Sequence, residues 1–248
     1  MNTTEARMLL GSKNVFGAEE WKAFYDEDVD APEIPWTEQD LKHPPIACEH
    51  FLFLGLDTLG YVHNDKDYMR VREGIPLDLN NIWMHFNSRT PTNDRGLMEF
   101  LDMTVNSNAE EEFMRPWYVR RQPFAEKTCE FRWYLMTVGA IAPLLSYDDQ
   151  IASLPAEYEL PTVIALTVAN MLYYLLNHRY MDAPLDSNNY LSHSFYNRTC
   201  DRTDSGQLVS LMNAGEKIII NFLNRDQRQP YTDVGITVSR KPPNNVGS

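Results

Sequence analysis

The longest apolar run in this chain extends from Leu160 to Tyr180 and reads LPTVIALTVANMLYYLLNHRY. Its apolar residues lie all around a helical circumference instead of along one stripe, which is typical of a helix buried on most sides. A membrane-spanning helix needs about 20 consecutive apolar residues, whereas Thr167 and Asn170 interrupt this run. We therefore predict a buried helix with Pro161 in its first turn and His178 in its last, where proline and positive groups respectively are favoured.

The rest of the pattern indicates strands. Five stretches have the apolar, aromatic and β-branched composition of strands: residues 51–54, 130–138, 207–213, 217–223 and 234–240. Two of them, 207–213 and 217–223, flank a short turn and predict a hairpin. Strands and helices do not alternate regularly, as a doubly wound parallel sheet requires. The predicted fold class is therefore α+β, with a mostly antiparallel sheet packed on the central helix at 160–180.

The first 50 residues differ from the rest in charge. They hold eleven Asp or Glu against four Lys or Arg, a net charge of −7. Residues 19–25 predict a short helix, and Thr37 with Asp40 resembles a capping box for a single helical turn. Four prolines between residues 32 and 45 favour extended chain elsewhere in this segment. We expect an extended acidic N-terminal arm.

The remaining boundaries follow from this division. We expect a single α+β domain at 51–241 and a frayed tail at 242–248. Residues 82–86 predict one more strand, and residues 95–105 predict a helix capped by Asp94. The other residues between 57 and 96 have no clear periodicity.

Composition bounds the class of protein. Hydrophobic residues make up 43% of the 248 positions, enough for a substantial core. The net charge of −13 disfavours nucleic acid and anionic membranes as partners. Cys48, Cys129 and Cys200 are odd in number and far apart, unlike a disulfide scaffold, and residues 1–13 lack the basic and apolar regions of a signal peptide. We expect a soluble cytoplasmic protein without a cofactor.

Common catalytic motifs are absent from the sequence, including the P-loop, the dinucleotide-binding glycines, the nucleophile elbow and the zincin helix. Cys48 and His50 resemble a nucleophile and base, but no third group is evident to orient them, and a half-buried cysteine beside a strand explains the pair. Asp148 and Asp149 resemble an acid/base pair, but the first turn of a helix capped by Ser146 accounts for both.

A polar turn before the predicted hairpin is a candidate site. It contains Asp201, Asp204, Ser205 and Gly206, and His193 precedes it. Two carboxylates and a hydroxyl can bind a hard cation, although the same residue types are ordinary turn formers. The turn supports a hydrolase, with or without a metal, whose site lies near His193, Asp201 and Asp204.

Residues 115–134 combine five Lys or Arg with two acids and six aromatic residues. Arg, Trp and Tyr are enriched at the centres of protein interfaces, and they also stack on bases. A simpler reading places the aromatic residues in the core and the arginines on the opposite face. The candidate interface residues of this basic aromatic patch are Trp117, Arg120, Arg121, Arg132, Trp133 and Tyr134.

Two functional hypotheses follow. In the first, the chain is a soluble acidic structural or interaction protein that assembles, with itself or with another protein, by docking the acidic arm on the basic aromatic patch. The alternative is the hydrolase with metal ligands Asp201 and Asp204. A third idea, mimicry of nucleic acid by acidic residues, is less favoured because the acids crowd the N-terminus. We prefer the first hypothesis because its evidence spans two segments.

Overall fold

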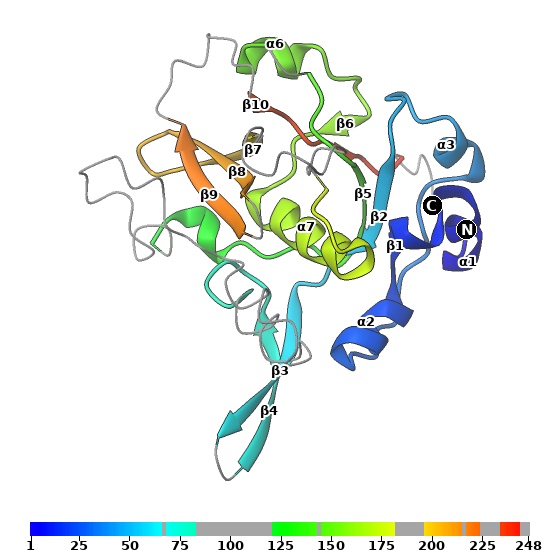
Figure 1. The fold of residues 1–248 in the computed structure, drawn as a ribbon, viewed down its shortest axis with the longest axis vertical. Helices are drawn as coiled ribbons and strands as arrows, with labels where there is room; N and C mark the ends of the chain where they lie inside the picture. The colour runs from blue at the N-terminus through cyan, green and yellow to red at the C-terminus, as the bar shows by residue number, and fades with distance from the viewer. Residues whose placement is uncertain are drawn as a thin grey trace.

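The fold is described here from a computed structural model. The residues that it describes are 1–65, 68–82, 121–142, 145–181, 196–214, 217–223 and 234–243. They form helices together with mixed and antiparallel sheets, which confirms the predicted α+β class (Figure 1). Most of the strand predicted at 82–86 and all of the helix predicted at 95–105 fall outside these residues.

Five α-helices and two short 3-10 helices lie in the described residues. They are α1 (Thr3–Leu10), η1 (Ser12–Asn14), α2 (Ala18–Tyr25), α3 (Glu38–Lys42), η4 (Pro123–Glu126), α6 (Tyr147–Ala152) and α7 (Val163–Asn177). In this part of the chain no helix has both the length and the apolar character needed to cross a bilayer.

Eleven strands accompany the helices in the same residues. They are β1 (Val15–Phe16), β2 (His50–Leu54), β3 (Thr58–Asp65), β4 (Tyr68–Pro76), β5 (Trp133–Thr137), β6 (Tyr158–Glu159), β7 (Tyr196–Arg202), β8 (Leu208–Ala214), β9 (Lys217–Leu223), β10 (Val234–Gly235) and β11 (Ser239–Arg240). The predicted strand at 51–54 and the predicted hairpin are confirmed as β2 and as the β8–β9 pair.

The strands form three sheets. The first has the order β1-β2-β5-β11-β6, with β1 parallel to β2 and the other pairs antiparallel. The second has the order β10-β7-β8-β9, in which β10 runs parallel to β7. The third is the β3–β4 hairpin, which projects away from the body (Figure 1).

Helix α7 is buried along most of its length and contacts β2 of the first sheet and β7 and β8 of the second. The two polar side chains in its apolar run are satisfied within the helix: Thr167 Oγ1 donates to the Val163 carbonyl and Asn170 Nδ2 to that of Leu166. The helix is shorter at both ends than the predicted range of 160–180. Thr162 is the N-cap, so Pro161 precedes the helix, and His178 is a left-handed C-cap with φ 55°.

Residues 1–50 hold more regular structure than the extended arm expected from the sequence. The helices predicted at 19–25 and after Thr37 are present as α2 and α3, and the Thr37–Asp40 capping box is formed. In addition, α1 begins with a capping box at Asn2, and β1 pairs with β2. Trp21 and Trp36 are buried in the main core, because these short elements turn their aromatic residues inward.

The stretch predicted as one strand at 234–240 is divided between two sheets. Val234 and Gly235 pair with β7, whereas Ser239 and Arg240 pair with β5 and β6. The backbone passes so close to Ala140 at Gly235 that a Cβ there would lie 2.8 Å from the Ala140 Cβ. The chain therefore crosses from the second sheet to the first within this stretch and does not form one continuous strand.

Candidate functional site

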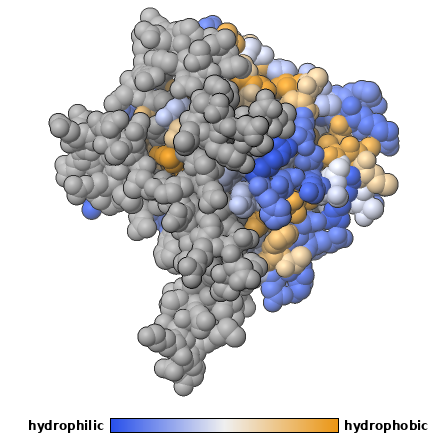
Figure 2. Space-filling view, viewed as in Figure 1, coloured by the Kyte–Doolittle hydropathy of each residue, from blue (hydrophilic) through white to orange (hydrophobic). Residues whose placement is uncertain are grey.

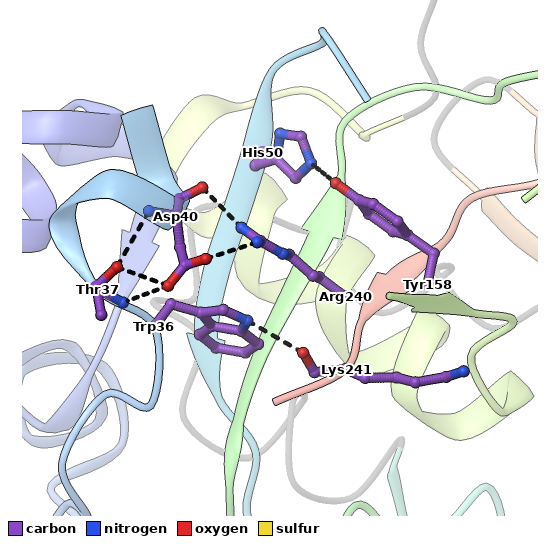
Figure 3. A network of polar contacts seen from close by, with 7 residues as sticks. All are labelled: Trp36, Thr37, Asp40, His50, Tyr158, Arg240 and Lys241. Carbon is purple, nitrogen blue, oxygen red and sulfur yellow. Dashed lines mark hydrogen bonds and ion pairs between the residues drawn. The ribbon is translucent and has the colours of Figure 1, made fainter. Parts of the chain in front are cut away.

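The Cys48–His50 segment leads into a buried polar cluster at the start of β2. His50 is 4% exposed, and its Nδ1 lies 2.8 Å from the Cys48 carbonyl oxygen. A carbonyl oxygen only accepts hydrogen bonds, so Nδ1 carries the proton and Nε2 is the acceptor. Tyr158 of β6 lies 3.1 Å away and donates its hydroxyl to Nε2 (Figure 3).

An ion pair lies beside this His50–Tyr158 pair. The Arg240 guanidinium of β11 donates to the Asp40 carbonyl at 2.7 Å and to its carboxylate at 2.8 Å. The other carboxylate oxygen of Asp40 accepts from the backbone N–H and hydroxyl of Thr37. Trp36 Nε1 donates to the Lys241 carbonyl at 3.2 Å (Figure 3). These contacts fasten α3 to a strand that follows it by about 200 residues.

Burial sets the protonation states in this cluster. It lowers the pKa of His50. The hydrogen bond to the Cys48 carbonyl raises this pKa, but by less than burial lowers it, and the positive charge of Arg240 lowers it further. Burial raises the pKa of the Tyr158 phenol, which stays protonated. Burial, together with the Glu49 charge, raises the pKa of the Cys48 thiol to about 11. Since a thiol is a far weaker nucleophile than a thiolate, these states favour a structural cluster over a Cys–His catalytic pair.

The lowered pKa of His50 leads to an expected pH dependence. As pH falls below 6.5, the ordinary histidine value, the unfolded chain gains a proton at His50 that the folded chain does not bind. The free energy of unfolding should therefore fall from that pH downward until the pH passes the lowered pKa. A His50→Gln variant, which keeps a donor and an acceptor without a titrating ring, should show a shallower fall in urea unfolding measured over this range.

Asp40 titrates in a separate window. Burial alone would raise its pKa, but the hydrogen bonds from Thr37 and the Arg240 charge outweigh burial and lower it. Its stabilising contribution is therefore lost only as pH falls below its ordinary value of 3.8. Parallel stability curves for the parent and His50→Gln as the pH falls from 6.5 toward 3.8 would contradict the role given to His50.

The predicted metal ligands Asp201 and Asp204 have different surroundings. Asp201 lies within β7, not in the turn, and its side chain is 1% exposed. Its Oδ1 lies 2.6 Å from Lys127 Nζ, and its Oδ2 accepts from the backbone N–H of Val163 at 2.7 Å. Asp201 thus satisfies a backbone donor in the first turn of α7, where a negative charge is favoured.

Asp204 is exposed in the turn that follows β7. Its backbone N–H donates to Gln122 Oε1 at 3.0 Å. His193 lies outside the described residues. Within those residues, no three His, Cys, Asp or Glu side chains gather as metal ligands.

The basic aromatic patch is described only in part, because Trp117 and Arg120 lie outside the described residues. Trp133 and Tyr134 are buried in β5, and Arg121 is exposed. The Arg132 guanidinium lies 4.4 Å from the centre of the Tyr134 ring and pairs with Glu130 and Glu159.

A direct contact joins the patch to the acidic segment of the same chain. Trp133 Nε1 donates to the Pro32 carbonyl at 2.7 Å. A Cβ on Gly17 would lie 3.1 Å from the Trp133 ring, so this turn also packs closely on the indole. The contact is made by an indole and a backbone carbonyl, not by a pair of opposite charges. Arg132, the described arginine beside it, pairs with Glu130 and Glu159, which lie outside the acidic segment.

Sequence reasoning singled out His50 and the Thr37–Asp40 capping box but missed Tyr158, Arg240 and Trp36. These residues meet across separations of about 100 to 200 positions. No local spacing signals such contacts. Arg240 carried only one hint, an arginine at the end of a predicted strand.

Comparison with protein-family models, with curated proteins and with solved structures found no match for this chain. Its helices and mixed sheets define the α+β class. Its function is therefore inferred from its own residues.

Proposed function

We propose that this chain is an interaction protein that assembles, with copies of itself or with another protein, through the acidic segment 1–50 and the basic aromatic patch at 115–134. The observation that supports this most is the orientation of the acidic segment. Its aromatic residues Trp21, Tyr25 and Trp36 are buried. Eight of its eleven acids are exposed: Glu5, Glu19, Asp26, Asp28, Asp30, Glu33, Glu38 and Glu49.

The folded segment holds these carboxylates in place, and this favours binding. Three short helices and β1 carry the segment, and Trp133 and Arg240 hold it on the sheet. Hydrophilic residues make up much of the surface on the side of the molecule where α1 to α3 lie, with apolar residues between them (Figures 1 and 2). A preorganised surface loses less conformational entropy on association than a flexible arm, and complementary charge directs a basic partner to it. We further propose that α7 and the sheets around it form the frame that supports this surface.

Neutralising part of the surface tests the proposal without removing core side chains. At low salt we expect the parent protein to be a multimer by light scattering after size exclusion, and to lose mass at high salt as the charges are screened. The triple variant Asp26→Asn, Asp28→Asn, Asp30→Asn should shift toward the monomer already at low salt. Asparagine is suitable at residue 26 because it tolerates the left-handed backbone found there.

The matched control changes the same amount of charge elsewhere. Asp57, Asp148 and Glu157 are also exposed and lie outside both segments, and replacing them by Asn, Asn and Gln should leave the parent mass unchanged. Equal effects of the two triple variants on the mass would show that assembly depends on the net charge of the protein and not on the acidic segment. A parent protein that is monomeric at both salt concentrations would contradict assembly with copies of itself.

The alternative proposal is a hydrolase near His193, Asp201 and Asp204. It requires Asp201 to be available to a metal or substrate, yet both oxygens of this buried carboxylate already have partners in Lys127 and Val163. We therefore conclude in favour of the interaction function.

A further inference from the structure

The chain between α2 and α3 is an exposed stretch without regular structure. Residues 26–36 contain neither helix nor strand, and the side chains of Asp28 and Asp30 point into solvent. Tyr25 and Trp36, at the two ends of the stretch, are buried in the main core. Exposed stretches of this kind are the places where proteases most often cut folded proteins.

The backbone in the middle of this stretch is available for pairing. Within the described residues, the peptide groups of residues 28–31 form no hydrogen bond with another backbone group. Val29 and Ala31 are only partly buried at the edge of the core. A hollow of about 550 Å³ lies beside Ala31 and Pro32. Because extended peptides bind through their free peptide groups as an added strand does, the stretch needs little rearrangement to enter the cleft of a protease.

Few side-chain contacts hold the stretch down. Asp28 pairs with Lys22 at 2.8 Å, with side chains 84% and 49% exposed, and an ion pair this exposed contributes little to stability. Glu27 accepts a hydrogen bond from a backbone N–H of β3 at 2.8 Å, and the Pro32 carbonyl accepts one from an indole N–H of β5. Displacing these two single bonds is a local opening and not an unfolding of the core.

The side chains around the Asp30–Ala31 bond specify a class of protease. Asp30 is exposed, and Ala31 after it is small. A carboxylate just before the bond fits an endopeptidase with a basic specificity pocket, because arginine binds carboxylates through two parallel hydrogen bonds. Val29 favours extended backbone, and Glu27 and Asp28 complement a basic cleft. Caspases, the cysteine endopeptidases that cleave after aspartate, bind substrates of this chemistry.

We propose that the Asp30–Ala31 bond is a processing site for an aspartate-specific endopeptidase of the caspase class. Hydrolysis adds the hydroxyl of one water molecule to the Asp30 carbonyl carbon and the remaining hydrogen to the Ala31 nitrogen, as the C–N bond between them breaks. No other reactant is consumed. The proposal is independent of assembly through residues 1–50, because it concerns the accessibility of one bond.

The cut separates α1 and α2 from the rest of the chain in covalent terms only. β1 remains paired with β2, and Trp21 remains bonded through its indole N–H to the Leu54 carbonyl. The first 30 residues then behave as a bound subunit, whose retention depends on protein concentration. Processing therefore makes a large part of the acidic segment separable from the core.

The test treats the folded 248-residue chain with a purified caspase that prefers the sequence Asp-Glu-Val-Asp. Intact-mass measurement should show that the first cut falls between Asp30 and Ala31. A synthetic peptide of residues 25–36 gives the rate for the unprotected sequence. The folded chain should be cut no more than about a hundredfold more slowly than the peptide, since cleavage follows the population of the locally open state.

Two variants test the specificity. Asp30→Glu keeps the charge but lengthens the side chain, and a displacement of about 1 Å at the reacting carbonyl can cost about a hundredfold in rate, so we expect cleavage at least about tenfold slower. Asp28→Glu makes the same change two residues earlier and should be cut as the parent is. An uncut peptide, a folded chain that resists while the peptide is cut, a first cut at another bond, or parental cleavage of Asp30→Glu would each overturn the proposal.

Discussion

Replacing Trp21 by alanine is expected to lower the free energy of unfolding by about 3–5 kcal/mol, the range found for large aromatic side chains removed from cores. Trp21 is 0% exposed and packs edge-on against Phe16, with ring centres 5.1 Å apart. Its indole N–H donates to the Leu54 carbonyl at 2.9 Å. The substitution therefore creates a cavity and removes the bond that ties α2 to β2.

Phe24 provides the control on the same helix, because its side chain is 39% exposed. Phe24→Ala should cost about 1 kcal/mol or less, as surface substitutions usually do. Urea unfolding of both variants measures the difference. Similar midpoints for Trp21→Ala and the parent would mean that residues 1–50 are an arm lying outside the cooperative fold, and would restore the extended arm expected from the sequence.

Replacing Asp201 by alanine should cost about 2–3 kcal/mol, because a buried donor that loses a charged acceptor is left unsatisfied. The donor is the Val163 backbone N–H at the start of α7. The Lys127 side chain is 50% exposed and can turn to water, so its share of the cost is small. Most of the loss thus falls on the N-terminal end of α7.

Asp204→Ala is the matched control, since Asp204 is exposed and its backbone N–H, which the substitution keeps, donates to Gln122. Its unfolding midpoint should stay close to that of the parent. The pair also separates the two functional proposals. If Asp201→Ala kept parental stability but abolished binding of a divalent metal by calorimetry, the hydrolase proposal would replace the interaction function.

Sequence reasoning was most successful where a structure is determined locally. The apolar run at 160–180 predicted α7, and the Thr37–Asp40 spacing predicted α3 with its cap. The β8–β9 hairpin followed from alternation about a short turn. In each case the deciding contacts join residues a few positions apart, so composition and spacing carry the information.

The features that sequence reasoning missed depend on distant contacts. β1 and β10 each contain two residues, too few for any periodicity, and each is defined by a parallel neighbour far along the chain. The prolines between residues 32 and 45 predicted extended chain, but buried aromatic residues of segment 1–50 decide its packing. Asp201 looked like a turn residue because its role at the end of α7 arises from a contact 38 positions away.

The placement of β11 affects how this protein forms during synthesis. Residues 239–240 lie between β5 and β6, and β1 lies at the far edge of the same sheet. Residue 240 must therefore have left the ribosome before the middle of the sheet can close. Until then β5 and β6 lack the strand that joins them. Such non-local pairing slows folding and leaves strand edges exposed in the meantime, so translation speed and chaperone capacity should influence the yield of folded protein.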